Sequence, residues 1–315
     1  MAIDILMIVV GLAFLLGGSD VFLRGGSSLA QNWGLSRLII GVIIVGFGTS
    51  MPELNVSVGA ILKGTPDIAL GNIIGSNIAN ILLVTSIASI ICPIRLPNIA
   101  VRFDIITMLL VVVLLCVLVY ADWLNAYAGV LMLLCLIAYI VKSFRRGREA
   151  VQSGSSIHSE SVPYEKSYGQ SVAYAMSFLG LSALMGGAYL VIDSAISLAQ
   201  YTGISQSVIG LTLVAVGTSL PELATVIVAS LRKHPDMIIG NVLGSNILNV
   251  LFILGITFLI DPIPVSRGIL NFDIWILLAS TIVFSVILLT KNEISRLTGS
   301  AMLVAYAAYI LILYT

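Results

Sequence analysis

The chain has 315 residues, of which 59% are hydrophobic and only 10% are charged, and its mean hydropathy is +1.10. Ordinary soluble domains are about 45–50% apolar and about 25% charged, so no soluble core of this size buries so much apolar surface. A water-soluble enzyme is therefore excluded. With 15 basic and 15 acidic residues, the charge is balanced and nothing indicates a nucleic-acid partner. The composition indicates an integral membrane protein.

Apolar segments recur along the whole chain and predict an all-α protein with ten transmembrane helices. A helix needs about 20 mainly apolar residues to cross ~30 Å of hydrocarbon. Ten segments meet this requirement, at residues 3–24, 36–61, 67–92, 103–121, 124–141, 169–199, 205–231, 237–260, 271–289 and 296–314. The sequence thus predicts a first five-helix unit at 1–142, a polar linker at 143–168 and a second five-helix unit at 169–315.

The basic residues predict the orientation of these helices. If the linker is cytoplasmic, both termini lie outside, because five helices lie on each side of it. The outer connections then hold only Lys63 and Arg267, and Arg24 lies near the inner end of the first helix. The inner connections hold Arg37, Arg95, Arg102, Lys142, Arg145, Arg146, Arg148, Lys166, Arg232, Lys233, Lys291 and Arg296. This asymmetry follows the positive-inside rule, and it predicts a multi-pass protein of the plasma or inner membrane.

Two motifs occur twice, and both repeat at the same offset along the chain. GFGTSMPEL at 46–54 returns as AVGTSLPEL at 215–223, and GNIIGSNIAN at 71–80 returns as GNVLGSNILN at 240–249. The repeated cores are at about 41–81 and 210–250. Because each half holds an odd number of helices, the halves are predicted to be inverted relative to each other in the membrane. Inverted repeats place a substrate site near the midplane, between broken helices.

Each copy of the first motif pairs a proline with a glutamate, Pro52 with Glu53 and Pro221 with Glu222. A proline inside a helix removes a backbone hydrogen bond, so helices 2 and 7 are predicted to break at the midplane. A charge at the bilayer centre costs about 2.5–3.5 kcal/mol, and no Lys or Arg is expected at that depth. Six to eight oxygen ligands suit Ca²⁺, whereas zinc and copper favour His and Cys. The oxygen set comprises the carboxylates, the freed carbonyls and the hydroxyls of Thr49, Ser50, Thr218 and Ser219.

The second motif predicts an opposing polar wall. Its side chains recur every four residues along one helix face, as Asn72, Ser76 and Asn80 and again as Asn241, Ser245 and Asn249. Polar side chains inside membranes also join helices. Helix joining and ion contact therefore both remain open for Asn72, Asn77, Asn241 and Asn246. Ion contact is favoured for Ser76, Asn80, Ser245 and Asn249.

The doubled motifs closely resemble the two α-repeats of the sodium/calcium exchanger family, within the wider cation/calcium exchanger superfamily. The resemblance covers essentially the whole chain, and the short linker indicates a compact prokaryotic-type member. It implies four cation positions between helices 2, 3, 7 and 8, shared by Glu53 and Glu222. It also implies that carbonyls of Thr49 and Thr218 complete the calcium position, and that Asn80 and Asn249 line the middle. The flanking sodium positions would use Ser50, Ser219, Ser76, Ser245 and the carbonyls of Gly46 and Ala215.

The resulting hypothesis is a secondary antiporter that exchanges Na⁺ for Ca²⁺ by alternating access. Several relatives carry Asp where this chain has Asn249, and in potassium-dependent exchangers that Asp is tied to the potassium requirement. Exchange is therefore expected to be independent of K⁺. The resemblance also implies that the two carboxylates face more than two Na⁺, so exchange is expected to be electrogenic. No enzymatic activity, cofactor or obligate protein partner is expected, and the partners are the two ions and the lipid bilayer. The alternatives are a proton-driven or potassium-dependent calcium exchanger and, more remotely, a cation channel.

Three charges in the long helices 1 and 6 have a separate interpretation. Asp20, Arg24 and Asp193 are expected to extend toward the membrane interface, and a role in gating is the alternative.

Overall fold

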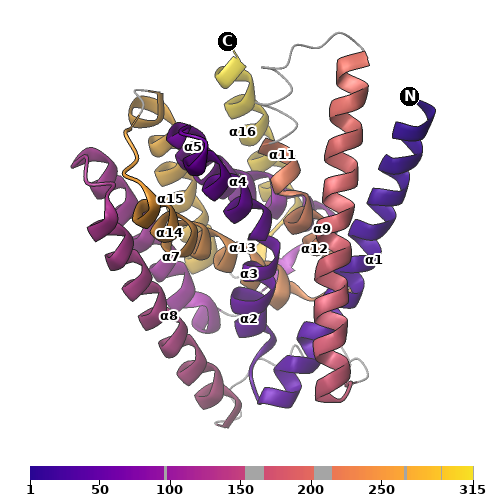
Figure 1. The fold of residues 1–315 in the computed structure, drawn as a ribbon. Coiled ribbons are helices and arrows are strands. Elements are labelled where there is room, and N and C mark those ends of the chain that lie inside the picture. Colours follow the sequence, from indigo (N-terminus) through magenta and orange to yellow (C-terminus); the bar gives the residue numbers. More distant parts are fainter. Residues whose placement is uncertain (96–97, 153–166, 202–214, 266–267, 292, 315) are drawn as a thin grey trace.

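The computed structural model describes residues 1–95, 98–152, 167–201, 215–265, 268–291 and 293–314, and it is almost entirely helical (Figure 1). Within these residues, eight helices are long and apolar enough to cross a membrane. A ninth span results if the bent pair Arg37–Thr49 and Met51–Leu62 is counted as one. The chain is therefore a helical membrane protein. The second predicted broken helix, at residues 205–231, begins outside the described residues.

The first half of the chain consists, in order, of α1 (Ala2–Trp33), α2 (Arg37–Ile40), the π-helical η1 (Gly41–Val45), α3 (Gly46–Thr49), α4 (Met51–Leu62), α5 (Pro66–Ala79), the π-helical η2 (Asn80–Val84), α6 (Thr85–Ile91), β1 (Ile94–Arg95), α7 (Asn98–Tyr120) and α8 (Ala126–Gln152). The second half consists of α9 (Gln170–Tyr201), α11 (Ala215–Thr218), α12 (Leu220–Leu231), α13 (Pro235–Leu248), the π-helical η4 (Asn249–Leu254), α14 (Gly255–Ile260), the π-helical η5 (Ile269–Asp273), α15 (Ile274–Thr290), β2 (Glu293–Ile294) and α16 (Arg296–Tyr314).

Two spans form the centre of the molecule. The continuous helices Pro66–Ile91 and Pro235–Ile260 are each 78% buried, whereas the other spans range from 17% to 44%. These two central helices carry the two copies of the GN-x-x-GSN motif. The less buried helices surround them and expose large apolar side chains such as Leu110, Phe178 and Val304, as a lipid-facing surface requires.

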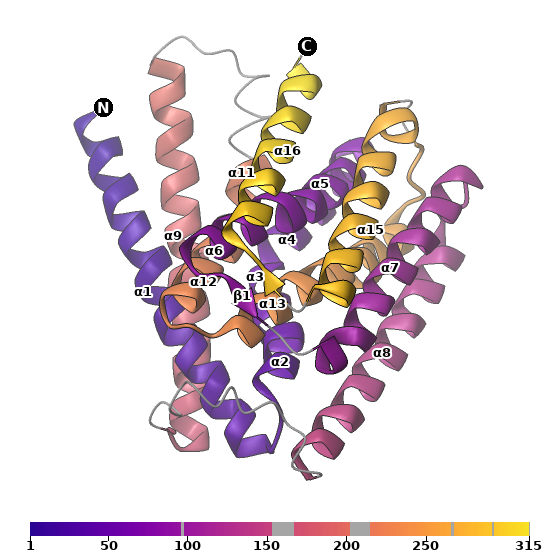
Figure 2. The ribbon, with the colours of Figure 1, turned by 180° about the vertical axis from the view of Figure 1, so that it is seen from behind.

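Helices α1 and α9 form a closely packed antiparallel pair at one side of the molecule (Figures 1 and 2). Glycines let the two backbones approach. A Cβ atom added to Gly18 would lie 2.9 Å from the Gly180 carbonyl oxygen, and one added to Gly187 would lie 2.7 Å from the Gly11 carbonyl oxygen. The α1 helix continues to Trp33, beyond the predicted end at residue 24, and ends at Gly34, whose positive φ of 62° terminates it.

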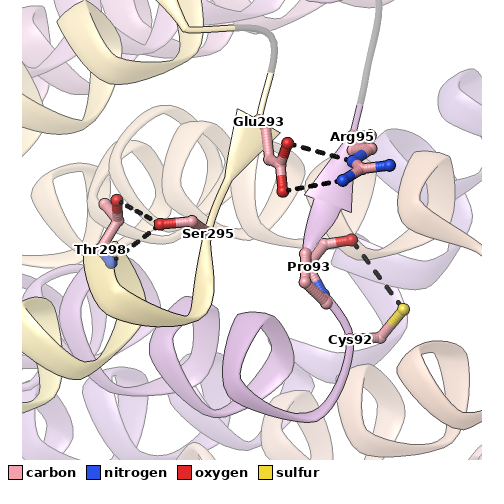
Figure 3. Close-up of polar contacts among 6 residues, drawn as sticks. All are labelled: Cys92, Pro93, Arg95, Glu293, Ser295 and Thr298. Atoms are coloured by element: carbon pink, nitrogen blue, oxygen red, sulfur yellow. Dashed lines mark hydrogen bonds and ion pairs between the residues drawn. The ribbon is translucent and has the colours of Figure 1, made fainter.

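A two-stranded antiparallel ribbon joins segments from the two halves of the chain. Ile94 in β1 pairs with Ile294 in β2, and Arg95 pairs with Glu293. Figure 3 shows two guanidinium nitrogens of Arg95 facing the two carboxylate oxygens of Glu293, with an Nε–Oε2 distance of 3.0 Å. The ribbon thus connects the end of the central helix Pro66–Ile91 to the start of α16.

The helix predicted at residues 124–141 is longer in the structure than in the prediction. Helix α8 continues to Gln152, through a stretch that was expected to be linker, and residues 153–166 lie outside the described residues. The extension has a physical reason. The added residues include Arg145, Arg146, Arg148 and Glu149, which are good helix formers, so the helix continues after its apolar run has ended. Both chain termini lie at the opposite end of the molecule from this end of α8 (Figure 1).

Candidate cation site

The predicted break of helix 2 is confirmed at Ser50. The two parts of this helix, Arg37–Thr49 and Met51–Leu62, meet at an angle of 43°. Ser50 has φ −82° and ψ 5°, and Ser219, between α11 and α12, has nearly the same values of −85° and 4°. Pro52 and Pro221 lie in the first turns of α4 and α12. At that position a missing N–H group removes no intrahelical hydrogen bond, so each proline favours a new helix start directly after the break.

The two glutamates lie in the first turns of the helices that follow the breaks. Glu53 is 0% exposed and Glu222 is 1% exposed. The Ser76 hydroxyl donates to Glu53 Oε1 over 3.0 Å, and the Ser50 hydroxyl donates to Glu222 Oε1 over 3.5 Å. Each carboxylate also lies at the positive end of a helix dipole, a position where a negative charge is stabilised less by solvent than by the backbone N–H groups of the first turn.

The second oxygen of each carboxylate has no hydrogen-bond partner among the described residues. These atoms are Glu53 Oε2 and Glu222 Oε2, and both are buried. None of the four ion pairs formed by the described residues includes either glutamate. Nor does a third acidic, His or Cys side chain join them within that part of the chain. A buried carboxylate without a positive partner is strongly unfavourable, so this arrangement suits a bound cation.

Serine and threonine hydroxyls connect the two helix breaks to the central helices. Ser76 lies 3.4 Å from Ser219, measured between the hydroxyl oxygens, and Thr49 lies 3.4 Å from Ser245. Thr218 contacts the Glu53 carboxylate and Thr49 that of Glu222. The side chains of Thr49, Ser50, Ser76, Thr218, Ser219 and Ser245 are all at most 3% exposed. The structure therefore gathers all six predicted hydroxyls around the glutamates, and each of them contacts a residue of the other half.

The carbonyl groups expected to contribute lie in the short helices before the breaks. The Gly46 carbonyl oxygen accepts from Ser50 N over 3.1 Å and contacts the hydroxyls of Thr49 and Ser245. A Cβ atom at Gly46 would lie 2.9 Å from Ser245 N, so only glycine permits this approach of α3 to α13. Ala215 is the first residue of α11, and its side chain lies outside the described residues.

The predicted middle residues mark a change in helix geometry. The π-helical segments η2 and η4 begin at Asn80 and Asn249, and both asparagine side chains are 0% exposed. Extra π-helical turns often accompany functional sites. Asn249 Nδ2 donates to Asn77 Oδ1 over 3.0 Å, and its Oδ1 has no partner among the described residues. In that same part of the chain, neither polar side-chain atom of Asn80 has a partner.

Three of the four asparagines left open between two roles make contacts that join helices, whereas Asn246 Nδ2 donates to the Val242 carbonyl oxygen of its own helix over 2.7 Å. Asn72 donates to Ser57 Oγ over 3.1 Å and to the Glu53 carbonyl oxygen over 3.3 Å, so it holds α5 against α4. Asn77 donates to the Asn246 carbonyl oxygen over 3.2 Å. Asn241 Oδ1 accepts from the Thr49 hydroxyl over 3.1 Å. Ser57 was not among the residues predicted from the sequence, although a serine one helical turn after Glu53 was a usable indication.

Comparison with known proteins decides the family. The family model described as "Sodium/calcium exchanger protein" matches residues 3–145 and 172–315. The chain belongs to the sodium/calcium exchanger family. Members of this family are transporters, so the chain is a transporter and not an enzyme. The sodium/calcium exchanger MaX1 of Methanosarcina acetivorans is 30% identical over 348 residues, which cover 99% of each chain. The inner membrane protein YrbG of Escherichia coli K12 is 32% identical over 283 residues, which cover 89% of this chain and 87% of YrbG.

Solved structures of a second exchanger have the same fold. The sodium-calcium exchanger NCX_Mj, soaked with zero Na⁺ and Ca²⁺, matches with a TM-score of 0.86 at 30% identity, covering 99% of this chain and 100% of that chain. Crystals of the same exchanger soaked with both Na⁺ and Ca²⁺ match with a TM-score of 0.84 at 30% identity, covering 98% of each chain. The resemblance found in the sequence motifs is thereby confirmed.

Proposed function

We propose that this exchanger family member carries Ca²⁺ across the membrane in one direction and Na⁺ in the other by alternating access. The observation that carries the proposal is the pair of fully buried carboxylates, Glu53 and Glu222, with one unpartnered oxygen each among the described residues and six hydroxyls around them. In an apolar interior, two negative charges select a divalent cation or several monovalent ones, and oxygen ligands favour Ca²⁺ over zinc or copper. MaX1 and NCX_Mj are exchangers of sodium and calcium by name, which supports the same substrates here.

The ligands follow the predicted set. Glu53 and Glu222, with the Thr49 and Thr218 carbonyls, would hold Ca²⁺. Na⁺ would use the hydroxyls of Ser50, Ser219, Ser76 and Ser245 with the carbonyls of Gly46 and Ala215, and Asn80 and Asn249 would line the middle. The neutral Asn249 leaves two formal charges, which is the basis for proposing electrogenic exchange that is independent of K⁺.

The architecture proposed for this function is ten transmembrane helices in two inverted five-helix repeats, at residues 1–142 and 169–315. Duplicated contacts support it. Tyr139 donates to Asp104 over 2.8 Å and Tyr309 donates to Asp273 over 3.0 Å, in the two halves. The β1–β2 ribbon has a partial counterpart: Ile263, which corresponds to Ile94 at the offset of the repeated motifs, donates its N–H to the Leu124 carbonyl oxygen over 3.0 Å, and Leu124 lies one residue from the position equivalent to Ile294. The antiparallel course of α1 and α9, the first helices of the two repeats, also fits the inversion.

The test is calcium uptake into proteoliposomes loaded with one driving ion at a time. Internal Na⁺ should drive uptake of isotopic calcium without K⁺ on either side and without a pH gradient. Uptake that is driven only by a pH gradient, or that appears only with K⁺, would move the protein to one of the sister branches. A flux that neither saturates nor needs a counter-ion would indicate a channel.

A further inference from the structure

An ion pair joins the outer helix pair to the end of a site-forming helix. Asp20 on α1 contacts the Arg232 guanidinium, and it also pairs with Arg24 over 3.0 Å. Arg232 is the residue that ends α12, the helix whose first turn carries Glu222. Helix α1 packs along α12 at this point. The Asp20–Arg232 pair therefore links α1 and α9 to the helix that holds half of the cation site.

The repeat supplies an equivalent of this arrangement on the other half. At the offset of the repeated motifs, Arg232 corresponds to Lys63, which ends α4, the helix that carries Glu53. The following turns are alike. Gly64 has φ 72° and Lys233 has φ 58°, and Thr65 N and His234 N each donate over 2.9 Å to the carbonyl of Ala60 and Ala229 respectively. Lys63 and Arg232 thus occupy the same position at the end of the same local structure.

The acidic partner also has a counterpart in the second half. Asp193 on α9 corresponds to Arg24 on α1, one helical turn or about 6 Å from the equivalent of Asp20. Asp193 and Lys63 are both exposed, and neither belongs to an ion pair among the described residues. Among the described residues, α9 and α4 do not pack against each other as α1 and α12 do. The Asp20–Arg232 pair is therefore formed in this conformation, whereas its counterpart between Asp193 and Lys63 is not.

We infer that the two charge pairs are alternating latches. The Asp20–Arg232 pair holds the helix pair α1–α9 against α12 and closes the cytoplasmic side in the conformation described. When α1 and α9 move against α4, this pair separates and Lys63 pairs with Asp193 to close the outer side. The inference rests on the proposed function, because it uses the inverted repeat and the cytoplasmic position of Arg232. It assigns a role to Asp20, Lys63, Asp193 and Arg232, none of which lies in the cation site.

The latches bias the population of two states and leave the ion ligands unchanged. Breaking one latch lowers the population of the conformation in which that latch is formed. The apparent affinity at each membrane face follows the fraction of sites that are open to that face. Arg232→Gln should therefore raise the half-saturating Ca²⁺ concentration at the outer face and lower it at the cytoplasmic face. Lys63→Gln should do the opposite. Each shift should be about two- to fivefold, the range expected for a partly exposed ion pair.

The experiment compares right-side-out and inside-out membrane vesicles, so that each face is measured separately by Na⁺-dependent uptake of isotopic calcium. Glu293→Gln is the matched control, because it breaks the Arg95–Glu293 pair, which joins neither α1 nor α9. It should leave both half-saturating concentrations unchanged. Exchanging the two charges of the second latch tests whether Lys63 and Asp193 contact each other. Lys63→Asp and Asp193→Lys should each shift the half-saturating Ca²⁺ concentrations at the two faces, and the double variant should return them toward the wild-type values.

The outcomes separate the two proposals. Opposite shifts from Arg232→Gln and Lys63→Gln, with recovery in the reversed pair, would support the latches. Shifts of the same sign, equal shifts in Glu293→Gln, or no recovery in the reversed pair would overturn them. Absence of Na⁺-dependent uptake in the wild type would instead overturn the proposed function.

Discussion

The hydroxyl of Ser76 donates a hydrogen bond of 3.0 Å to Glu53 Oε1 and lies 3.4 Å from the hydroxyl oxygen of Ser219. One serine of a central helix thus contacts Glu53, just after the break in its own half, and Ser219, between α11 and α12 in the other half. Glu222 reaches the opposite half as well, through the Ser50 hydroxyl. The residues of the candidate site therefore come from both halves of the chain and contact one another across them.

Glu53→Gln or Glu222→Gln should each reduce calcium transport at least about 100-fold. Either substitution leaves a divalent cation with a single carboxylate in a desolvated site, where removing one charge costs several kcal/mol. Initial rates of isotopic calcium uptake in proteoliposomes measure the effect, after protein insertion has been equalised. A correctly inserted variant that exchanges calcium at nearly the wild-type rate would show that the site has been misassigned.

Asn249→Asp should change the net charge of the Ca²⁺-loaded site and therefore the ion or voltage dependence of the step that carries Ca²⁺ across the membrane. The wild-type site holds two carboxylates, so a Ca²⁺-loaded site is neutral, whereas a third carboxylate would leave it negative. The variant should then need an additional monovalent cation or should become sensitive to voltage during calcium exchange against calcium. The matched variant is Asn80→Asp, at the equivalent position. An unchanged ion requirement in both variants would argue that neither residue lines the site.

Wild-type exchange should be electrogenic. If more than two Na⁺ replace one Ca²⁺ on two carboxylates, the sodium-loaded site crosses with net positive charge, and one charge is worth about 2.3 kcal/mol per 100 mV. With Na⁺ inside the vesicles, an inside-positive potential should accelerate calcium uptake, and an inside-negative potential should slow it. A K⁺ ionophore sets the potential while the Na⁺ gradient is held constant. Uptake that is indifferent to voltage would require two Na⁺ per Ca²⁺ or a proton on one glutamate.

The contribution of His234 to stability should decrease as the pH falls from about 6.5 to about 4. Burial, together with the nearby Arg37 and Arg232, lowers the pKa of His234 from 6.5 to about 4. Arg37 can only donate, so in their contact of 3.2 Å His234 Nδ1 accepts and the ring is neutral. Between these two pH values the unfolded chain binds more protons than the folded one, and acid therefore favours unfolding. In His234→Gln, the apparent melting temperature should fall less steeply over this range. An unchanged slope would contradict the lowered pKa.

The linker should face the cytoplasm and both termini the outside. A cysteine at Ser155, which lies outside the described residues, should be protected from an impermeant thiol reagent in intact cells and should react after permeabilisation. A cysteine at Lys63 should show the reverse and react in intact cells. Labelling of the Ser155 cysteine without permeabilisation would contradict both the orientation and the proposed pairing of the halves.

Much of this site was predictable from the sequence, because its elements are local. Pro52 and Pro221 restrict the backbone at their own positions, so the break at Ser50 and the equivalent turn at Ser219 follow from the motif itself. The lengths of the apolar segments predicted the membrane spans, and the constant offset between the repeated motifs identified both glutamates. The four-residue spacing of Asn72, Ser76 and Asn80 likewise places them on one helix face without knowledge of any neighbour.

Only the tertiary structure decided which side chains meet. Ser50 contacts Glu222 of the other half, whereas Ser76 contacts Glu53 of its own half, and Asp20 reaches Arg232 on a different helix. Such contacts depend on how far each helix is rotated about its axis and on how closely glycines allow two backbones to approach. Local periodicity contains neither quantity. The sequence by itself therefore determined the membrane class, the breaks and the charged residues, and long-range packing determined how these residues form one site.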